Sequence, residues 1–98
     1  MTAPPDATPD DLVLTPPNRV ARAGHTVEVG PTVWVALRVL NGTAGRRLPV
    51  AALCRAVWGT DAVPAGTVWS LCHRANRHLG RLGHAARCGV DQGDVVLV

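Results

Sequence analysis

The stretch GTVWSLCHRANRHLGRLGH, residues 66–84, carries three arginines and three histidines and no acidic residue. Its apolar residues recur at helical spacing, and at 100° per residue one side of a helix over 66–82 collects Val68, Cys72, Ala75, Leu79 and Leu82. The opposite side and its flank carry the polar, basic and aromatic residues Trp69, Ser70, His73, Arg74, Asn76, Arg77 and Arg81. The stretch therefore predicts a helix with one buried side and one side of uncompensated positive charge.

The charge of the chain is unevenly distributed around this helix. The 98 residues include ten arginines, no lysine and seven acidic residues, which gives a formal net charge of +3. No acidic residue lies between Asp61 and Asp91, whereas this interval contains the three arginines of the helix and Arg87. A local positive field attracts polyanions, of which nucleic acid is the commonest, and arginine forms forked hydrogen bonds to phosphate and guanine. The alternative interpretation is a solvated basic surface that serves solubility.

Size and composition limit the class of protein. A chain of 98 residues with 47% hydrophobic residues predicts one folded domain with a modest core. No run of 18 apolar residues is present, so no membrane partner is expected. The first eleven residues lack the basic and apolar regions of a signal peptide, which predicts a cytoplasmic protein.

Proline content divides the chain in two. Residues 1–17 contain five of the eight prolines and three aspartates, which predicts a flexible acidic tail ahead of a folded domain over 18–98. The apolar triplet at 12–14 leaves open an additional short strand within this tail.

The folded part predicts an α+β domain. The alternating residues of 19–30 predict a short β-hairpin. Proline and glycine signals bracket one helix over 31–41 and a second from about 49 to 58, ahead of the basic helix. Residues 85–98 predict a strand, a tight turn and a last strand. The expected order is a short N-terminal β-hairpin, a three-helix core and a C-terminal β-hairpin.

Three passages resemble the winged helix-turn-helix effector domain of OmpR/PhoB-type transcriptional regulators, over roughly residues 19–98. VGPTVWVALRVL (29–40) is similar to the start of the family's first helix, RRLPVAALCRAVWG (46–59) to the passage that ends in Val-Trp-Gly, and TVWSLCHRANRHLGRLG (67–83) to the recognition helix. The resemblance implies a winged helix-turn-helix fold, with the third helix in the DNA major groove. By position it implies that Trp69, His73, Arg74 and Arg77 face DNA and that Ser70 and Arg81 lie near phosphates.

Two departures from the family pattern concern function. The C-terminal hairpin, which would be the wing, carries Asp91 and Asp94 at its tip, where carboxylates oppose an approach to phosphate. The 98 residues contain no receiver domain, so a standalone domain without the usual phosphorylation input is expected.

The sequence thus predicts a small protein that binds double-stranded DNA as a transcriptional regulator. In the major groove, Arg pairs with guanine and Asn with adenine, and nearby side chains supply further contacts. The residues expected to contact DNA are Trp69, Ser70, His73, Arg74, Asn76, Arg77, Arg81 and Arg87. Because one helix buries little surface, tight specific binding requires a homodimer or tandem sites. The alternative is a winged-helix protein–protein interaction module that does not bind DNA, which an exposed Trp69 and the acidic hairpin tip would favour.

Catalysis and metal binding are not expected. The acidic residues are scattered in turns and in the tail, no nucleophile has an orienting partner, and no glycine-rich phosphate loop is present. Cys54 and Cys72 lie on the apolar sides of different helices, whereas a zinc site requires four converging ligands. We therefore predict no catalytic residue, no metal and no cofactor. Buried reduced thiols are expected, with Cys88 partly exposed on the hairpin.

Overall fold

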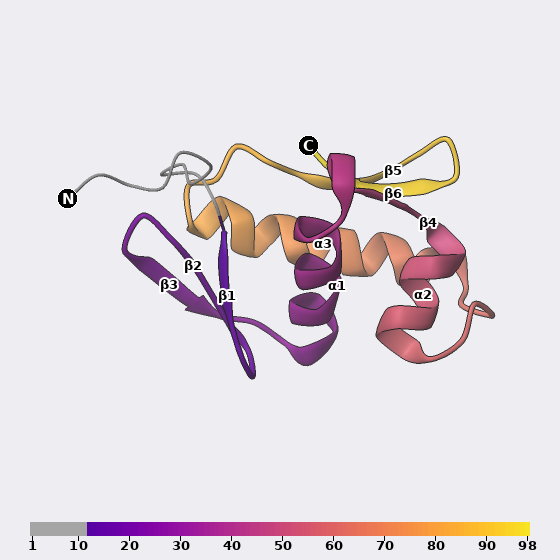
Figure 1. Cartoon of the computed structure of the whole chain (residues 1–98), viewed down its shortest axis with the longest axis horizontal. Coiled ribbons are helices and arrows are strands. Elements are labelled where there is room, and N and C mark those ends of the chain that lie inside the picture. The colour runs from indigo at the N-terminus through magenta and orange to yellow at the C-terminus, as the bar shows by residue number, and fades with distance from the viewer. Residues whose placement is uncertain (1–11) are drawn as a thin grey trace.

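The computed structural model describes residues 12–98 and has two small antiparallel sheets and three α-helices (Figure 1). The elements, in chain order, are β1 (Val13–Thr15), β2 (Arg19–Arg22), β3 (His25–Glu28), α1 (Pro31–Asn41), the short 3-10 helix η1 (Ala44–Arg46), β4 (Arg47–Pro49), α2 (Val50–Trp58), α3 (Ala65–Arg81), β5 (Cys88–Asp91) and β6 (Asp94–Leu97). The predicted α+β class and the three helices are confirmed. No helix of the described part is long and apolar enough to cross a membrane.

A proline lies at or directly before the start of each of the three helices. Pro31 is the first residue of α1, and Pro49 and Pro64 immediately precede α2 and α3. The fixed φ of proline suits a helix start, and its missing N–H is no loss there because the first N–H groups of a helix have no intrahelical partner. Gly59 ends α2 in the left-handed conformation, with φ 75°, and its N–H donates to the carbonyl of Arg55 at 3.0 Å.

The N-terminal sheet has three strands in the order β1-β2-β3, not the two strands of the predicted hairpin. Val20 pairs with Leu14 on one side and Val27 on the other. The short strand that the sequence left open at 12–14 is present as β1, so the last residues of the predicted tail belong to the folded part: Leu12 is buried in the core and Leu14 is packed against it. Burial of these two leucines outweighs the tendency of the nearby prolines to keep the segment extended and solvated. Residues 1–11 of the predicted tail lie outside the described residues.

The C-terminal hairpin was predicted, but its sheet contains one more strand. The order is β4-β6-β5, in which Leu48 of β4 pairs with Val95 of β6. Gln92 and Gly93 both have positive φ, 50° and 81°, as a two-residue turn between right-twisted strands requires. Strand β4 has three residues, too few for a period-two pattern to stand out in the sequence.

Helix α3 is the longest element and lies across α1, with the N-terminal sheet near its carboxyl end and the β5–β6 hairpin along it (Figure 1). The five apolar positions predicted for its inner side are all buried, and Leu71 joins them. At the carboxyl end, Nη1 of Arg22 in β2 donates to the carbonyl of Leu82 at 3.1 Å. Helix α3 is thus held from both sheets and from α1, which leaves one long side of it uncovered.

Candidate nucleic-acid interface

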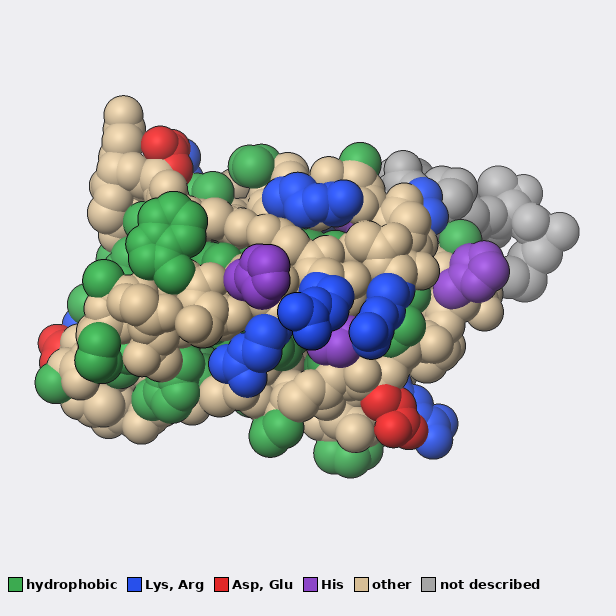
Figure 2. All heavy atoms as spheres, turned by 180° about the vertical axis from the view of Figure 1, so that it is seen from behind, with side chains coloured by type: hydrophobic (Ala, Val, Ile, Leu, Met, Phe, Trp, Pro, Cys, Tyr) green, Lys and Arg blue, Asp and Glu red, His purple; other side chains and the backbone are tan. Residues whose placement is uncertain are grey.

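The uncovered side of α3 presents six of the eight predicted contact residues to solvent: Trp69, Ser70, His73, Arg74, Arg77 and Arg81. Ser70, Arg74, Arg77 and Arg81 are spaced by four, three and four residues, so they form one stripe along the helix. At 1.5 Å per residue this stripe is about 16 Å long. Figure 2 shows arginine and histidine side chains gathered across the middle of one face, beside a group of hydrophobic side chains.

The arginines of this stripe have no carboxylate partner among residues 12–98. The ion pairs found there belong to Arg47 and Arg55, and α3 itself contains no acidic residue. The guanidinium groups of Arg74, Arg77 and Arg81 therefore keep their donors for solvent or for a ligand. Charge-assisted pairs with phosphate are the strongest hydrogen bonds that such groups form.

His78 lies beside this stripe and is affected by its charge. The side chain is half-buried, and its Nδ1 atom has no hydrogen-bond partner among the described residues. Burial lowers the pKa of His78, and the positive charges of Arg81 and Arg77 lower it further. The depressed pKa is the response expected of a partly buried imidazole that also lies in a positive local field.

Asn76 was predicted to contact DNA, but it is half-buried and its amide is already used. Its Nδ2 donates to the carbonyl of Cys88 at 2.9 Å, and its Oδ1 accepts from the N–H of Cys88 at 2.6 Å. The sequence placed Asn76 on the uncovered side because helical periodicity does not reveal that β5 packs against that flank. Asn76 positions β5 against α3, and we remove it from the set of contact residues.

Arg87 is exposed, but its guanidinium is held by its own loop. Nη1 of Arg87 donates to the carbonyls of His84 at 2.5 Å and Ala86 at 2.7 Å. The buried His84 helps to fix the same loop, because its Nδ1 accepts from the N–H of Ala86 at 2.9 Å. Arg87 therefore adds positive charge near the carboxyl end of α3, with less reach than the arginines of the helix.

The acidic tip of the β5–β6 hairpin is partly neutralised, which the sequence did not predict. Arg47 of β4 donates from Nε to Oδ2 of Asp94 at 2.9 Å and from Nη2 to Oδ2 of Asp91 at 3.2 Å. Hydrogen bonds to Asp94 and Asp91 raise the pKa of Arg47. These three residues together carry one negative charge, instead of the two that the hairpin has by itself.

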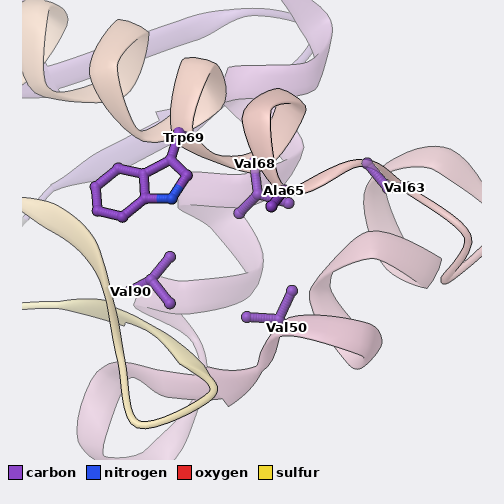
Figure 3. A pocket seen from close by; sticks show the side chains of 6 residues that line it. All are labelled: Val50, Val63, Ala65, Val68, Trp69 and Val90. Carbon is purple, nitrogen blue, oxygen red and sulfur yellow. The ribbon is translucent and has the colours of Figure 1, made fainter.

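An apolar pocket opens next to Trp69, at the amino end of α3. Its volume is about 180 Å³, and its lining comes from α2, the loop before α3, α3 and β5: Val50, Val63, Ala65, Val68, Trp69 and Val90. The indole ring of Trp69 lies above Val90 at the edge of this pocket (Figure 3). Trp69 is 60% exposed, so the ring is a large apolar surface offered to solvent or to a ligand.

Residues 12–98 contain no group of three or more His, Cys, Asp or Glu side chains arranged to hold a metal ion. The three cysteines are free and buried, so the expectation that Cys88 is partly exposed was wrong. Its strand packs against α3, which covers the thiol. Comparison with protein-family models, with curated proteins and with solved structures gives no match for this chain.

Proposed function

We propose that the protein binds double-stranded DNA as a winged helix-turn-helix domain, with α3 in the major groove. The proposal rests on the three arginines of the stripe, Arg74, Arg77 and Arg81. They have no partner among the described residues, and they lie on the exposed side of a helix whose other side is in the core. The major groove of B-DNA is about 12 Å wide and admits one α-helix. A rigidly anchored helix presents its side chains to the groove without further ordering.

Roles on the helix follow from position and chemistry. Arg74 and Arg77, in the middle of α3, contact guanine edges and phosphates, and Ser70 and Arg81 contact phosphates toward the two ends. His73 and Trp69 lie beside the stripe and adjust sequence preference. The β5–β6 hairpin takes the place of the wing and contributes little affinity, because its tip remains net negative even with Arg47 in place.

The size of the interface bears on the oligomeric state of the bound protein. One helix and a weak wing bury less surface than specific DNA complexes typically do, so we propose that two copies occupy adjacent half-sites. A protein that binds in this way acts as a transcriptional regulator when its sites lie in promoters. Sedimentation of the protein with duplexes of one and two half-sites tests the stoichiometry.

The DNA-binding proposal is tested by fluorescence anisotropy with a labelled random duplex at several salt concentrations. We expect the logarithm of the association constant to fall linearly with the logarithm of the salt concentration, with a slope of about −3 to −5. Each neutralised phosphate contributes about −0.9 to this slope. The double variant R74A/R77A should flatten the slope by about 2 units. The matched control R19A/R55A removes the same charge from exposed positions outside α3 and should change the slope little. Absence of binding at low salt, or equal slopes for the two double variants, contradicts the proposal.

A second candidate is a winged-helix protein–protein interaction module, and the exposed Trp69 beside an apolar pocket favours it. An apolar partner side chain would fill the pocket, with partner carboxylates over Arg74. The two candidates differ in their salt dependence, because apolar docking is weakly screened whereas phosphate binding is strongly screened. The Trp69→Ala variant is tested in the same anisotropy experiment. If it binds random duplex as tightly as the wild type does, the indole is not needed for the phosphate contacts.

A further inference from the structure

Two buried thiols meet where α3 packs against the C-terminal sheet. The sulfur atoms of Cys72 in α3 and Cys88 in β5 are 3.2 Å apart, and both side chains are nearly inaccessible to solvent. A disulfide bond is about 2.0 Å long, so an approach of roughly 1.2 Å would join these two sulfurs. The third cysteine, Cys54, lies on a different helix, α2.

The position of the two sulfurs is set by the packing of their elements. Asn76, one helical turn after Cys72, holds both backbone polar groups of Cys88 through its amide. Gly89 and the rest of β5 pair with β6, whose Val95 and Leu97 are in the core. The proximity of the thiols therefore follows from the packing of α3 against β5, which leaves only a short distance between the two sulfurs.

We propose that Cys72 and Cys88 are an oxidisable pair, which hydrogen peroxide or a comparably small hydroperoxide converts to a disulfide between α3 and β5. The burial of both thiols favours a small neutral oxidant over a bulky disulfide reagent. This modification site does not depend on DNA binding. It would, however, enclose Arg74, Arg77 and Arg81 in a covalently closed loop of residues 72–88.

The reaction balances with one peroxide per pair. The Cys72 thiol loses its proton, and the thiolate attacks one peroxide oxygen, so that the O–O bond breaks and a sulfenic acid forms on Cys72. The released hydroxide takes up the proton as water. The Cys88 sulfur then attacks the Cys72 sulfur, the S–O bond breaks, and the leaving hydroxide departs as a second water with the Cys88 proton. The two sulfurs lose two electrons and the two peroxide oxygens gain them.

The hydrogen bond between the thiols selects which sulfur reacts first. The S–H of Cys88 donates to the sulfur of Cys72. This bond stabilises the Cys72 thiolate and lowers the pKa of Cys72, although burial opposes the effect. The same bond, together with burial, raises the pKa of Cys88. Cys72 is therefore the sulfur that attacks peroxide and Cys88 the one that resolves the sulfenic acid.

The experiment oxidises the reduced, full-length protein with one equivalent of hydrogen peroxide and maps its tryptic peptides without reduction. Trypsin places the three cysteines in separate peptides, Cys54 in 48–55, Cys72 in 56–74 and Cys88 in 88–98. We expect peptides 56–74 and 88–98 to be joined, with a mass lower by two hydrogen atoms. Because the bond closes a loop of residues 72–88 and so restricts the unfolded chain, the melting temperature of the oxidised protein should rise by about 12 °C or more and return on reduction.

Two cysteine variants distinguish the Cys72–Cys88 pair from the third thiol. Cys54→Ser keeps both thiols of the pair and should form the disulfide as the wild type does. Cys88→Ser lacks one thiol of the pair, so peroxide should not raise its melting temperature. The proposal is overturned if 56–74 and 88–98 remain separate after oxidation, or if Cys72 proceeds to a sulfinic acid. It is overturned equally if the bond joins two copies of the chain, since the pair then does not close within one protein.

Discussion

The side-chain amide of Asn76 pairs with the backbone of Cys88, donating to its carbonyl at 2.9 Å and accepting from its N–H at 2.6 Å. This is how the first strand of the C-terminal hairpin is aligned with the middle of α3. At this point the Asn76 side chain supplies the hydrogen-bond partners that a neighbouring strand would otherwise give to Cys88. The Asn76 amide thus adds to the pairing of β5 with β6 and to the core packing of β6, and a residue that the sequence assigned to DNA contact is structural.

Asn76→Ala should therefore destabilise the fold and leave the phosphate contacts in place. The variant leaves a carbonyl and an N–H of Cys88 without partners in a half-buried site, which costs about 2 kcal/mol of unfolding free energy. Urea denaturation measures the loss. The control Ser70→Ala removes an exposed hydroxyl from the same helix and should stay within about 0.5 kcal/mol of the wild type. Equal stability of the two variants would show that the Asn76 hydrogen bonds are dispensable.

The sequence contains enough local information to predict the helices. Pro31, Pro49 and Pro64 begin them or directly precede them, Gly59 ends α2, and the apolar period of the basic stretch identifies the buried side of α3. These signals act within a few residues of one another, so they are visible in the chain before it folds.

The features that sequence analysis missed are produced by contacts between distant residues. Strand β4 has three residues, and only its pairing with β6 identifies it, whereas the short strand left open at 12–14 is fixed as β1 by its pairing with β2. The pairing of Arg47 with Asp94 and the contact of Cys72 with Cys88 likewise join separate elements. Of the candidate site, the exposed stripe on α3 was predictable from periodicity, whereas the role of Asn76 and the partial neutralisation of the hairpin tip were not.

Removing the carboxylates of the hairpin tip should strengthen DNA binding. In D91N/D94N, Arg47 keeps its positive charge while the two negative charges that it offsets are lost. We expect the dissociation constant for random duplex to fall roughly five-fold at low salt, and the gain to shrink as salt screens the field. Anisotropy titration measures both effects. The control is Glu28→Gln, which removes one exposed carboxylate from the N-terminal sheet. A gain in affinity of similar size in this control would mean that the DNA does not bind near the hairpin tip.

Two glycines with open space around them should respond to alanine in opposite ways. A Cβ atom added at Gly80 or at Gly59 meets no atom within 4 Å. Gly80 is within α3, where alanine has a higher helix propensity, so Gly80→Ala should stabilise the fold by about 0.5 kcal/mol. Gly59 has a φ of +75°, where an L side chain is strained, so Gly59→Ala should cost about 1 kcal/mol. Thermal or urea unfolding compares the two, and the same sign for both would contradict the assigned backbone conformations.

His78 should make the folded protein less stable in mildly acidic solution. Burial, followed by the charges of Arg81 and Arg77, lowers its pKa in the folded state below the ordinary value of about 6.5 that it regains on unfolding. Between these two pKa values the unfolded chain binds more protons than the folded one. The stability contributed by neutral His78 is therefore complete above about pH 6.5 and is lost as the pH falls toward the folded-state pKa.

The measurement is the urea midpoint at pH 7.5 and at pH 5.5 for the wild type and for His78→Gln. Other groups also titrate in this interval, so the difference between the two proteins isolates His78. We expect the midpoint of the wild type to drop more than that of the variant, because glutamine has no proton to gain next to Arg77 and Arg81. A parallel drop would mean that neither burial nor the charges of Arg81 and Arg77 lower the pKa of His78 in the folded protein.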